Sequence, residues 1–312
     1  MYYVKYFKYL IYILFSSALF IKCNGFVMND SKYFPQKVFQ YSDDVSINYE
    51  VKGIGDKKII FLHGFGASLN SWNDIKDLFP QNEYELFLLD LKGFGFSSKP
   101  LDDKYSIRDQ AEIIHSFMKS LNTNEIYLIG HSFGGGVALL TYLISIENKE
   151  DSLIDKLVLI DCAAYPQDIP FFVQYLRTPI LNHLIFLLPS KFRAEYTLKH
   201  LFYNSNKVND AIVERYASFF SSENYKYTFI ESACQILPDN YSYLISKYRE
   251  IKIPTLIIWG KNDKALPVSN GVKLHNEISN SELKIIDKCG HIPQEEHPEE
   301  TFLLINNFLK GK

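Results

Sequence analysis

The stretch Gly130-His131-Ser132-Phe133-Gly134 constrains the fold of this chain more than any other. An apolar, β-favouring run over 125–129 precedes it, and residues 135–140 follow with the composition of a helix. A strand, a sharp turn carrying Ser and a helix form the context in which Gly-x-Ser-x-Gly exposes a serine hydroxyl. Glycine fits at 130 and 134 because a Cβ would collide where strand and helix close together. We therefore interpret Ser132 as a nucleophile; a glycine-rich turn with a chance serine is the alternative.

Length and composition bound the other possibilities. The 312 residues suffice for one large α/β domain, or for a domain with an insertion. Hydrophobic residues at 47% and charged residues at 22% are ordinary for a globular protein. The net charge of −3 gives no indication of a nucleic-acid partner.

The N-terminus has the pattern of a targeting segment. Lys5 and Lys8 precede an uncharged run, Tyr9–Ile21, that is shorter than the ~20 residues of a membrane span. Cys23-Asn24-Gly25 then supplies small residues for a cleavage site. We expect residues 1–25 to be a signal peptide and the protein to be exported, periplasmic or secreted. The alternative is an uncleaved N-terminal membrane anchor.

The rest of the chain alternates strand and helix patterns. Phe34–Tyr41 and Val45–Val51 alternate in the manner of half-buried strands and predict an opening antiparallel hairpin. Apolar runs typical of strands buried on both faces follow at 59–62, 86–90, 125–129, 156–161, 255–260 and 283–286. Helical spacing marks 105–121, with Ser106 as its N-cap, and 301–309. This order predicts a mostly parallel, doubly wound sheet.

Residues 163–245 follow a different pattern. They contain no buried-strand run, are rich in Phe and Tyr, and are punctuated by prolines. We predict a helical cap inserted between two parts of one core, 26–162 and 246–312. Most of its aromatic residues must pack within the cap, and some are expected to line a pocket.

Three polar residues each lie directly after a predicted strand: Ser132, Asp263 and His291. The carboxyl ends of parallel strands meet at one sheet edge, where ligands bind in such folds. A histidine is a suitable base at neutral pH, and a carboxylate fixes its tautomer. The order Ser, Asp, His is that of α/β-hydrolases. Asp161 also follows a strand and competes with Asp263 for the role of the acid. No metal-ligand spacing is present.

The loop His63-Gly64-Phe65-Gly66 follows the buried strand at 59–62. In the context of the serine turn it is a candidate oxyanion loop with the Phe65 N–H as donor. A plain turn explains the glycines equally well.

Three further motifs are Asp90-Leu91-Lys92-Gly93-Phe94-Gly95, Trp259-Gly260-Lys261-Asn262-Asp263 and Gly290-His291-Ile292-Pro293. With these and the motifs above, the chain resembles the α/β-hydrolase superfamily. The resemblance runs from about Tyr49 to Leu309 and is to the capped branch of esterases, lipases and C–C-bond hydrolases. It implies a triad of Ser132, Asp263 and His291, oxyanion donors at the backbone N–H groups of Phe65 and Phe133, and no metal or organic cofactor. A serine nucleophile argues against the dehalogenase and epoxide hydrolase branches, which use an aspartate.

These observations predict a carboxylesterase or lipase-like serine hydrolase that acts through an acyl-enzyme on small esters with apolar groups. His131 favours esters over C–C bonds within the family resemblance. The alternatives are a C–C-bond or thioester hydrolase with the same triad, and a small-molecule binding protein that retains it. We expect no nucleic-acid partner, and membrane association only through the N-terminal segment.

Overall fold

The computed structural model describes residues 37–123, 125–150, 153–166, 169–222, 224–237 and 241–311. All of them belong to the compact unit Pro35–Lys312. The expected signal peptide, residues 1–25, lies outside the described residues.

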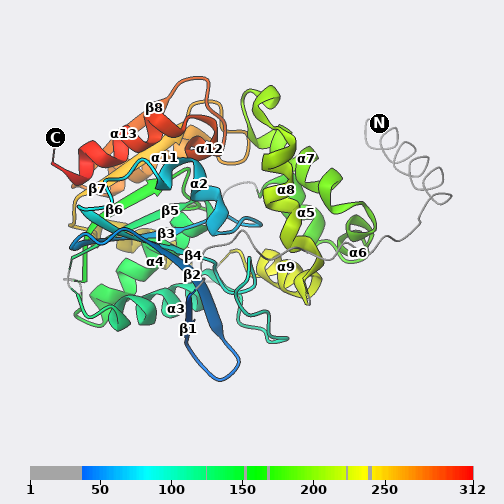
Figure 1. Ribbon diagram of the computed structural model, residues 1–312, viewed down its shortest axis with the longest axis horizontal. Coiled ribbons are helices and arrows are strands. Elements are labelled where there is room, and N and C mark those ends of the chain that lie inside the picture. Colours follow the sequence, from blue (N-terminus) through cyan, green and yellow to red (C-terminus); the bar gives the residue numbers. More distant parts are fainter. Residues whose placement is uncertain are drawn as a thin grey trace. The chain divides into compact units, whose positions relative to one another are not determined.

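Eight strands of the described chain form one sheet (Figure 1). Their order across the sheet is β1-β2-β4-β3-β5-β6-β7-β8. The strands are β1 Lys37–Gln40, β2 Ser46–Lys52, β3 Lys57–Leu62, β4 Tyr84–Leu89, β5 Ile126–His131, β6 Ile154–Ile160, β7 Thr255–Gly260 and β8 Ser281–Ile286. β1 pairs antiparallel with β2, and β2 with β4; every other pairing is parallel. The predicted opening hairpin and the mostly parallel sheet are confirmed.

The two faces of the sheet carry separate hydrophobic clusters because side chains alternate along each strand. In β3, Ile60 and Leu62 point to one cluster while Ile59 and Phe61 point to the other, and all four are inaccessible to solvent. The strand is thus buried on both faces, as its apolar run predicts.

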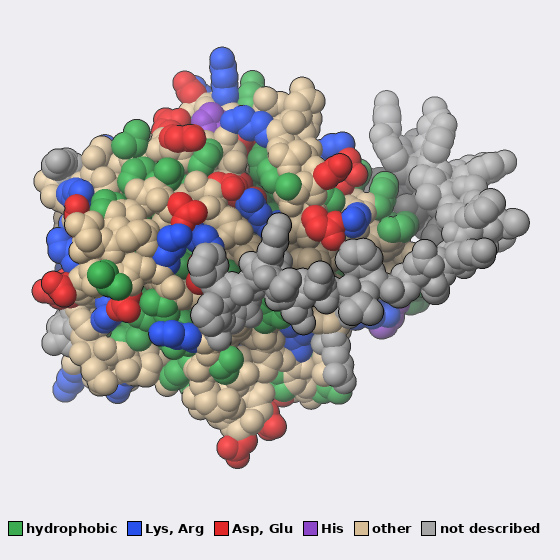
Figure 2. Space-filling view, in the orientation of Figure 1, with side chains coloured by type: hydrophobic (Ala, Val, Ile, Leu, Met, Phe, Trp, Pro, Cys, Tyr) green, Lys and Arg blue, Asp and Glu red, His purple; other side chains and the backbone are tan. Residues whose placement is uncertain are grey.

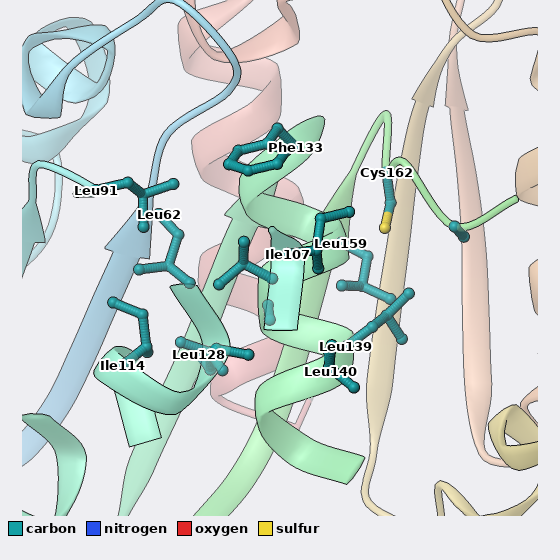
Figure 3. Packing of buried hydrophobic residues seen from close by; sticks show 14 of the residues in the cluster. Leu62, Leu91, Ile107, Ile114, Leu128, Phe133, Leu139, Leu140, Leu159 and Cys162 are labelled. Atoms are coloured by element: carbon teal, nitrogen blue, oxygen red, sulfur yellow. The ribbon is translucent and has the colours of Figure 1, made fainter. Parts of the chain in front are cut away.

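Helices cover both faces. The core helices are η1 Leu69–Trp72, α2 Asn73–Lys76, α3 Ile107–Ser120, α4 Phe133–Glu147, α11 Val268–Glu277, α12 Pro293–Glu296 and α13 Pro298–Leu309. Figure 1 shows α3 and α4 below the sheet and α13 above it. Figure 3 shows Ile107 and Ile114 of α3 packed among side chains of the strands and of α4. The predicted N-cap is confirmed: Ser106 and Asp109 form a capping box, which satisfies backbone N–H groups at the start of α3.

A second region of helices lies between β6 and β7, in the part of the chain for which the sequence predicts a cap, and extends to Glu250. Its helices are α5 Phe171–Arg177, α6 Leu181–Leu184, η3 Ile185–Leu187, α7 Ser190–Leu201, η4 Ser205–Lys207, α8 Asp210–Ala217, η5 Ser218–Ser221, α9 Tyr225–Cys234, α10 Tyr241–Lys247 and η6 Tyr248–Glu250. α5, α7, α8 and α9 lie side by side at one end of the sheet (Figure 1).

Buried ionic groups join the cap to the core. The Arg215 guanidinium on α8 donates to Asp74 at 2.9 Å and to Glu295 at 3.0 Å. The Tyr216 hydroxyl donates to the same Glu295 carboxylate at 2.6 Å. Burial raises the pKa of Glu295 to about 7, although Arg215 and the Tyr216 hydroxyl oppose this shift.

Acidic and basic side chains are interspersed over the face seen in Figure 2, in keeping with the small net charge. Within the described ranges, no helix combines the length and the apolar character that a membrane crossing needs.

Candidate active site

Ser132 lies in the turn between β5 and α4, in a backbone conformation that few non-glycine residues adopt. Its φ is 52° and its ψ −117°, and its N–H donates to Ile160 O at 2.9 Å. A Cβ at Gly130 would lie 2.3 Å from the Gly134 carbonyl oxygen, and one at Gly134 would lie 2.4 Å from the Leu62 carbonyl oxygen. Only glycine allows this close approach, so the two glycines of the motif permit the strained turn.

The structure brings Ser132, His291 and Asp263 into one chain of hydrogen bonds. His291 Nε2 lies 2.9 Å from Ser132 Oγ, and His291 Nδ1 lies 2.7 Å from Asp263 Oδ2. Ser132, Asp263 and His291 follow the ends of β5, β7 and β8, respectively. In the order of the sheet, β6 lies between β5 and β7, and β8 is next to β7. With Nδ1–H donating to the carboxylate, Nε2 is free to accept the serine proton.

Asp263 is fixed by more than the histidine. Its Oδ1 accepts backbone N–H groups of Ala265 at 2.7 Å and Leu266 at 3.0 Å, and its side chain has no exposed area. Burial alone would raise the pKa of Asp263. The charge and hydrogen bond of His291, with the Leu266 N–H, outweigh burial and lower it. The carboxylate is therefore ionised, the form that orients an imidazole.

His131 is a functional contact that the sequence does not reveal. Its Nε2–H donates to the His291 backbone oxygen at 2.7 Å, and the two rings lie 5.1 Å apart. Burial, followed by the charge of His291, lowers the pKa of His131 to about 3, so its ring is neutral. This bond joins the strand β5 end to the loop that carries His291, which limits the movement of that loop.

Glu296 is a second such contact. Its carboxylate accepts the backbone N–H groups of Gly290 at 2.7 Å, Tyr203 at 3.0 Å and Asn204 at 2.7 Å. The His291 N–H itself donates to Leu201 O at 2.8 Å. One buried carboxylate thus bonds both the loop that carries His291 and the segment that follows cap helix α7. No sequence pattern marks Glu296 for this role.

The two backbone groups expected to bind an oxyanion lie beside Ser132. A Cβ at Gly64 would lie 3.3 Å from Ser132 Cβ, so the 63–66 loop contacts the serine turn. Within the described part of the chain, no hydrogen bond takes up the backbone N–H of Phe65 or of Phe133. Phe133 is the first residue of α4, where an N–H has no partner inside the helix.

A cavity opens onto Ser132 and is mostly apolar. About 70 Å³ of it can be reached by the centre of a water molecule. Its described lining comes from the core and the cap: Gly64, Phe65, Ala67, His131, Ser132, Phe133, Ala163, Ile169, Pro170, Phe172, Val173, Leu201, Tyr216, Ile236, Leu237, Tyr241, Leu266, His291 and Ile292. None of these lining residues is a Lys, Arg, Asp or Glu.

The rival acid, Asp161, follows β6, the strand between β5 and β7. Its Oδ1 accepts the Gly260 N–H at 3.0 Å, and it forms no hydrogen bond with His291 among the described contacts. A carboxyl oxygen of Asp161, a carboxyl oxygen of Asp263 and a ring nitrogen of His291 nevertheless all lie within 4.8 Å of one another.

His63 has a structural environment rather than a place in the hydrogen-bond chain. Its Nδ1–H donates to Gly64 O at 2.8 Å, and its Nε2 accepts the Leu91 N–H at 3.0 Å. Burial lowers the pKa of His63 to about 4. The ring is therefore neutral and part of the core at neutral pH.

We expect the His63 environment to make the fold sensitive to acid. An unfolded histidine has a pKa of about 6.5, so the unfolded chain binds this proton first as the pH falls. The free energy of unfolding therefore has its full value above pH 6.5. It falls by on the order of 3 kcal/mol as the pH approaches 4. Urea unfolding at pH 7, 5.5 and 4 should show that His63→Gln, which cannot be protonated, loses less stability than wild type. Equal losses in both proteins would contradict this assignment.

Comparison with known protein families agrees with the fold. The family profile described as alpha/beta hydrolase fold matches residues 57–298. A 2-hydroxy-6-oxononadienedioate/2-hydroxy-6-oxononatrienedioate hydrolase of Escherichia coli is 29% identical over 274 residues, which cover 84% of this chain and 90% of the relative. An uncharacterized hydrolase of Bacillus subtilis is 25% identical over 271 residues, covering 86% and 96%.

Solved structures share the same architecture. A bromoperoxidase from Bacillus anthracis matches with a TM-score of 0.73 and 21% identity, covering 85% of this chain and 96% of the other. A variant of a meta-cleavage product hydrolase from Pseudomonas fluorescens matches with a TM-score of 0.71 and 22% identity, covering 86% and 95%. At these identities the similarity is one of fold.

Proposed function

Because this chain belongs to the alpha/beta hydrolase fold family and is a hydrolase, we propose that it cleaves carboxylic esters with apolar groups through an acyl-enzyme. The observation that carries the proposal is the hydrogen-bond chain from Ser132 Oγ through His291 to Asp263 at 2.9 and 2.7 Å. The apolar cavity at Ser132 supports the choice of substrate.

In the proposed reaction, Ser132 Oγ attacks the ester carbonyl carbon while His291 Nε2 takes its proton. The oxygen that becomes negative accepts hydrogen bonds from the N–H groups of Phe65 and Phe133. As the C–O bond breaks, His291 returns the proton to the leaving alcohol. A water molecule then attacks the acyl-enzyme by the same route, with His291 again as base, and frees the acid.

A panel of p-nitrophenyl esters of increasing acyl length tests this function. Pre-steady-state mixing should give a burst of p-nitrophenol equal to the enzyme concentration wherever deacylation is slower than acylation. The burst should be absent in Ser132→Ala, which cannot form the acyl-enzyme. A protein that binds the esters without turnover would instead be a receptor that retains the triad.

Cleavage of a C–C bond by the same residues is the second candidate. It is favoured by the Escherichia coli relative, whose name specifies an oxo-dienedioate substrate. A dioate carries two carboxylates, and charged groups entering an apolar site require a partner. The described lining of the cavity offers no Lys or Arg. Loss of the absorbance of such a dienedioate, with no activity on the ester panel, would favour this candidate instead.

We expect the cap to determine chain-length preference without supplying a catalytic group. Phe172 on α5 lines the cavity, so Phe172→Ala enlarges the space for an acyl chain. The preference for long over short esters, measured as the ratio of kcat/KM, should rise by about tenfold or more, with short-ester kcat within about threefold of wild type.

Tyr196→Ala is the matched control for Phe172→Ala. Tyr196 lies on α7, is 61% exposed and does not line the cavity, so its removal should leave chain-length preference unchanged. A uniform collapse of kcat on all esters in a well-folded Phe172→Ala would mean that the cap contributes to the chemistry itself.

A further inference from the structure

Asp161 is a buried carboxyl whose hydrogen bonding is incomplete. It follows β6 with a φ of 41° and has no exposed area. Among the described residues it accepts one hydrogen bond, from the Gly260 N–H to Oδ1. Its Oδ2 has no partner among the described residues. A buried carboxyl oxygen without a partner is costly, so its protonation state and its neighbours need an explanation.

Two members of the proposed triad lie close to Asp161. A carboxyl oxygen of Asp161, one of Asp263 and a ring nitrogen of His291 lie within 4.8 Å of one another. Two ionised carboxylates at this separation in a buried site repel each other strongly, and one of the two then retains a proton.

The hydrogen-bond donors decide which carboxyl is protonated. Asp263 receives three donors, from His291 Nδ1, the Ala265 N–H and the Leu266 N–H. From the part of the chain that the structure describes, Asp161 receives one. Donors stabilise the ionised form, so the negative charge belongs on Asp263 and the proton on Asp161.

We propose that Asp161 is a protonated carboxylic acid that donates its O–H to Asp263, so that a pair of carboxyls sharing one proton orients His291. Asp161 is then a positioning residue: it touches no substrate and acts through Asp263. The inference deepens the proposed acyl-transfer function and rests on it wherever activity is measured.

The surroundings of the pair support this distribution of charge. Burial, followed by the negative charge of Asp263, raises the pKa of Asp161 well above its usual value. Glu296 adds a further negative charge that acts in the same direction. The thiols of Cys162 and Cys289 also face the pair, and burial raises the pKa of each, so both are neutral.

Two histidines also lie close to the pair. His291 bonds Asp263 directly, and the neutral ring of His131 bonds the backbone oxygen of His291. The pair therefore presents one negative charge to His291, on Asp263. The neutral O–H of Asp161 orients the Asp263 carboxylate by donating a hydrogen bond to it.

Two substitutions of Asp161 separate this role from an ionised one. Asp161→Asn keeps an oxygen for the Gly260 N–H and supplies an N–H donor to Asp263, and asparagine tolerates the left-handed φ. We expect its kcat/KM on esters to stay within about tenfold of wild type, with the acid limb of the pH–rate profile displaced by less than about 0.3 pH unit. Asp161→Ala is uncharged but supplies no hydrogen-bond donor to Asp263. Its kcat/KM on esters should fall by on the order of 10–100-fold, as when a group supporting a metal-bound histidine is removed.

An ionised Asp161 would give a different pH profile. Neutralising a charge this close to His291 in Asp161→Asn would move the acid limb by about one pH unit to lower pH. That displacement would overturn the proposal, and so would an Asp161→Ala variant with wild-type kcat and an unchanged melting temperature.

Infrared difference spectroscopy tests the protonation state without any substrate. At pH 7 the wild-type spectrum should contain the carbonyl band of a buried, protonated carboxylic acid that Asp161→Asn lacks. Subtracting the variant removes the contribution of other carboxyls that are partly protonated at pH 7, such as Glu295 with its pKa of about 7. Absence of the band overturns the proposal even if the enzyme is an active esterase. Its presence in a protein that hydrolyses no ester would leave the proposed function as the part that is wrong.

Discussion

Ser132→Ala is expected to lower kcat on any ester by on the order of 10⁶-fold, the loss seen when a serine protease loses its nucleophile. The remaining rate should still exceed that of the reaction in water by about 10³-fold, because the oxyanion donors and the pocket remain. The hydroxyl bonds only His291 among the described residues, so its removal leaves the contacts of the fold unchanged.

Ser145→Ala is the matched control. Ser145 lies on α4, the helix that directly follows Ser132, and its buried hydroxyl donates to Thr141 O at 3.1 Å. Its substitution tests the effect of losing a serine hydroxyl from this helix, and kcat should be unchanged. A Ser132→Ala enzyme that keeps more than a few per cent of wild-type kcat, with an unaltered melting curve, would show that another residue is the nucleophile.

Asp263→Asn should reduce kcat by at least about 10³-fold, compared with about 10⁴-fold for the equivalent change in a serine protease. Oδ1 is already held by the N–H groups of Ala265 and Leu266, so an asparagine would keep its oxygen there. Its NH₂ would then face His291 Nδ1, which would have to accept. The imidazole would carry its hydrogen on Nε2 and be unable to take the proton of Ser132.

Asp161→Asn is the comparison that identifies the acid. The two aspartates lie at neighbouring strand ends, but only Asp263 bonds His291, so Asp161→Asn should cost less than about tenfold. Steady-state kinetics on variants of matched thermal stability check the ranking. If Asp161→Asn lost more activity than Asp263→Asn, Asp161 would be the acid that orients the histidine.

The strands and their order along the chain were predictable because long apolar runs in a parallel sheet are distinctive. β3, β6 and β7 lie where the runs at 59–62, 156–161 and 255–260 indicate. The places of Ser132, Asp263 and His291 after strands follow from the same runs, since parallel strands end at one edge.

Helix prediction was less successful where local preferences oppose the observed structure. The sequence did not predict helix α11. α11 contains Gly271, a poor helix former. A Cβ there would lie 2.6 Å from the Trp259 ring, so the reason for the glycine is a tertiary contact that no local pattern reveals.

The contacts that fix the histidine loop could not be inferred for a related reason. His131 and His291 are 160 residues apart, and Glu296 bonds backbone groups more than 90 residues away. Such bonds depend on how strand ends and cap segments meet in space. The incomplete hydrogen bonding of Asp161 likewise appears only when β6 and β7 are side by side.

The strand order also has a consequence for when the protein can first act. Ser132 is synthesised early, but its partner His291 follows β8, the last strand, and the sheet between them requires β6 and β7 to be in register. On the ribosome, a nascent chain that ends before residue 291 has a nucleophile without a base. Contacts of this sequence separation form late because closing so long a loop is entropically costly. Hydrolytic activity is thus a signal of completed folding, and its recovery during refolding should follow the slowest step of sheet assembly.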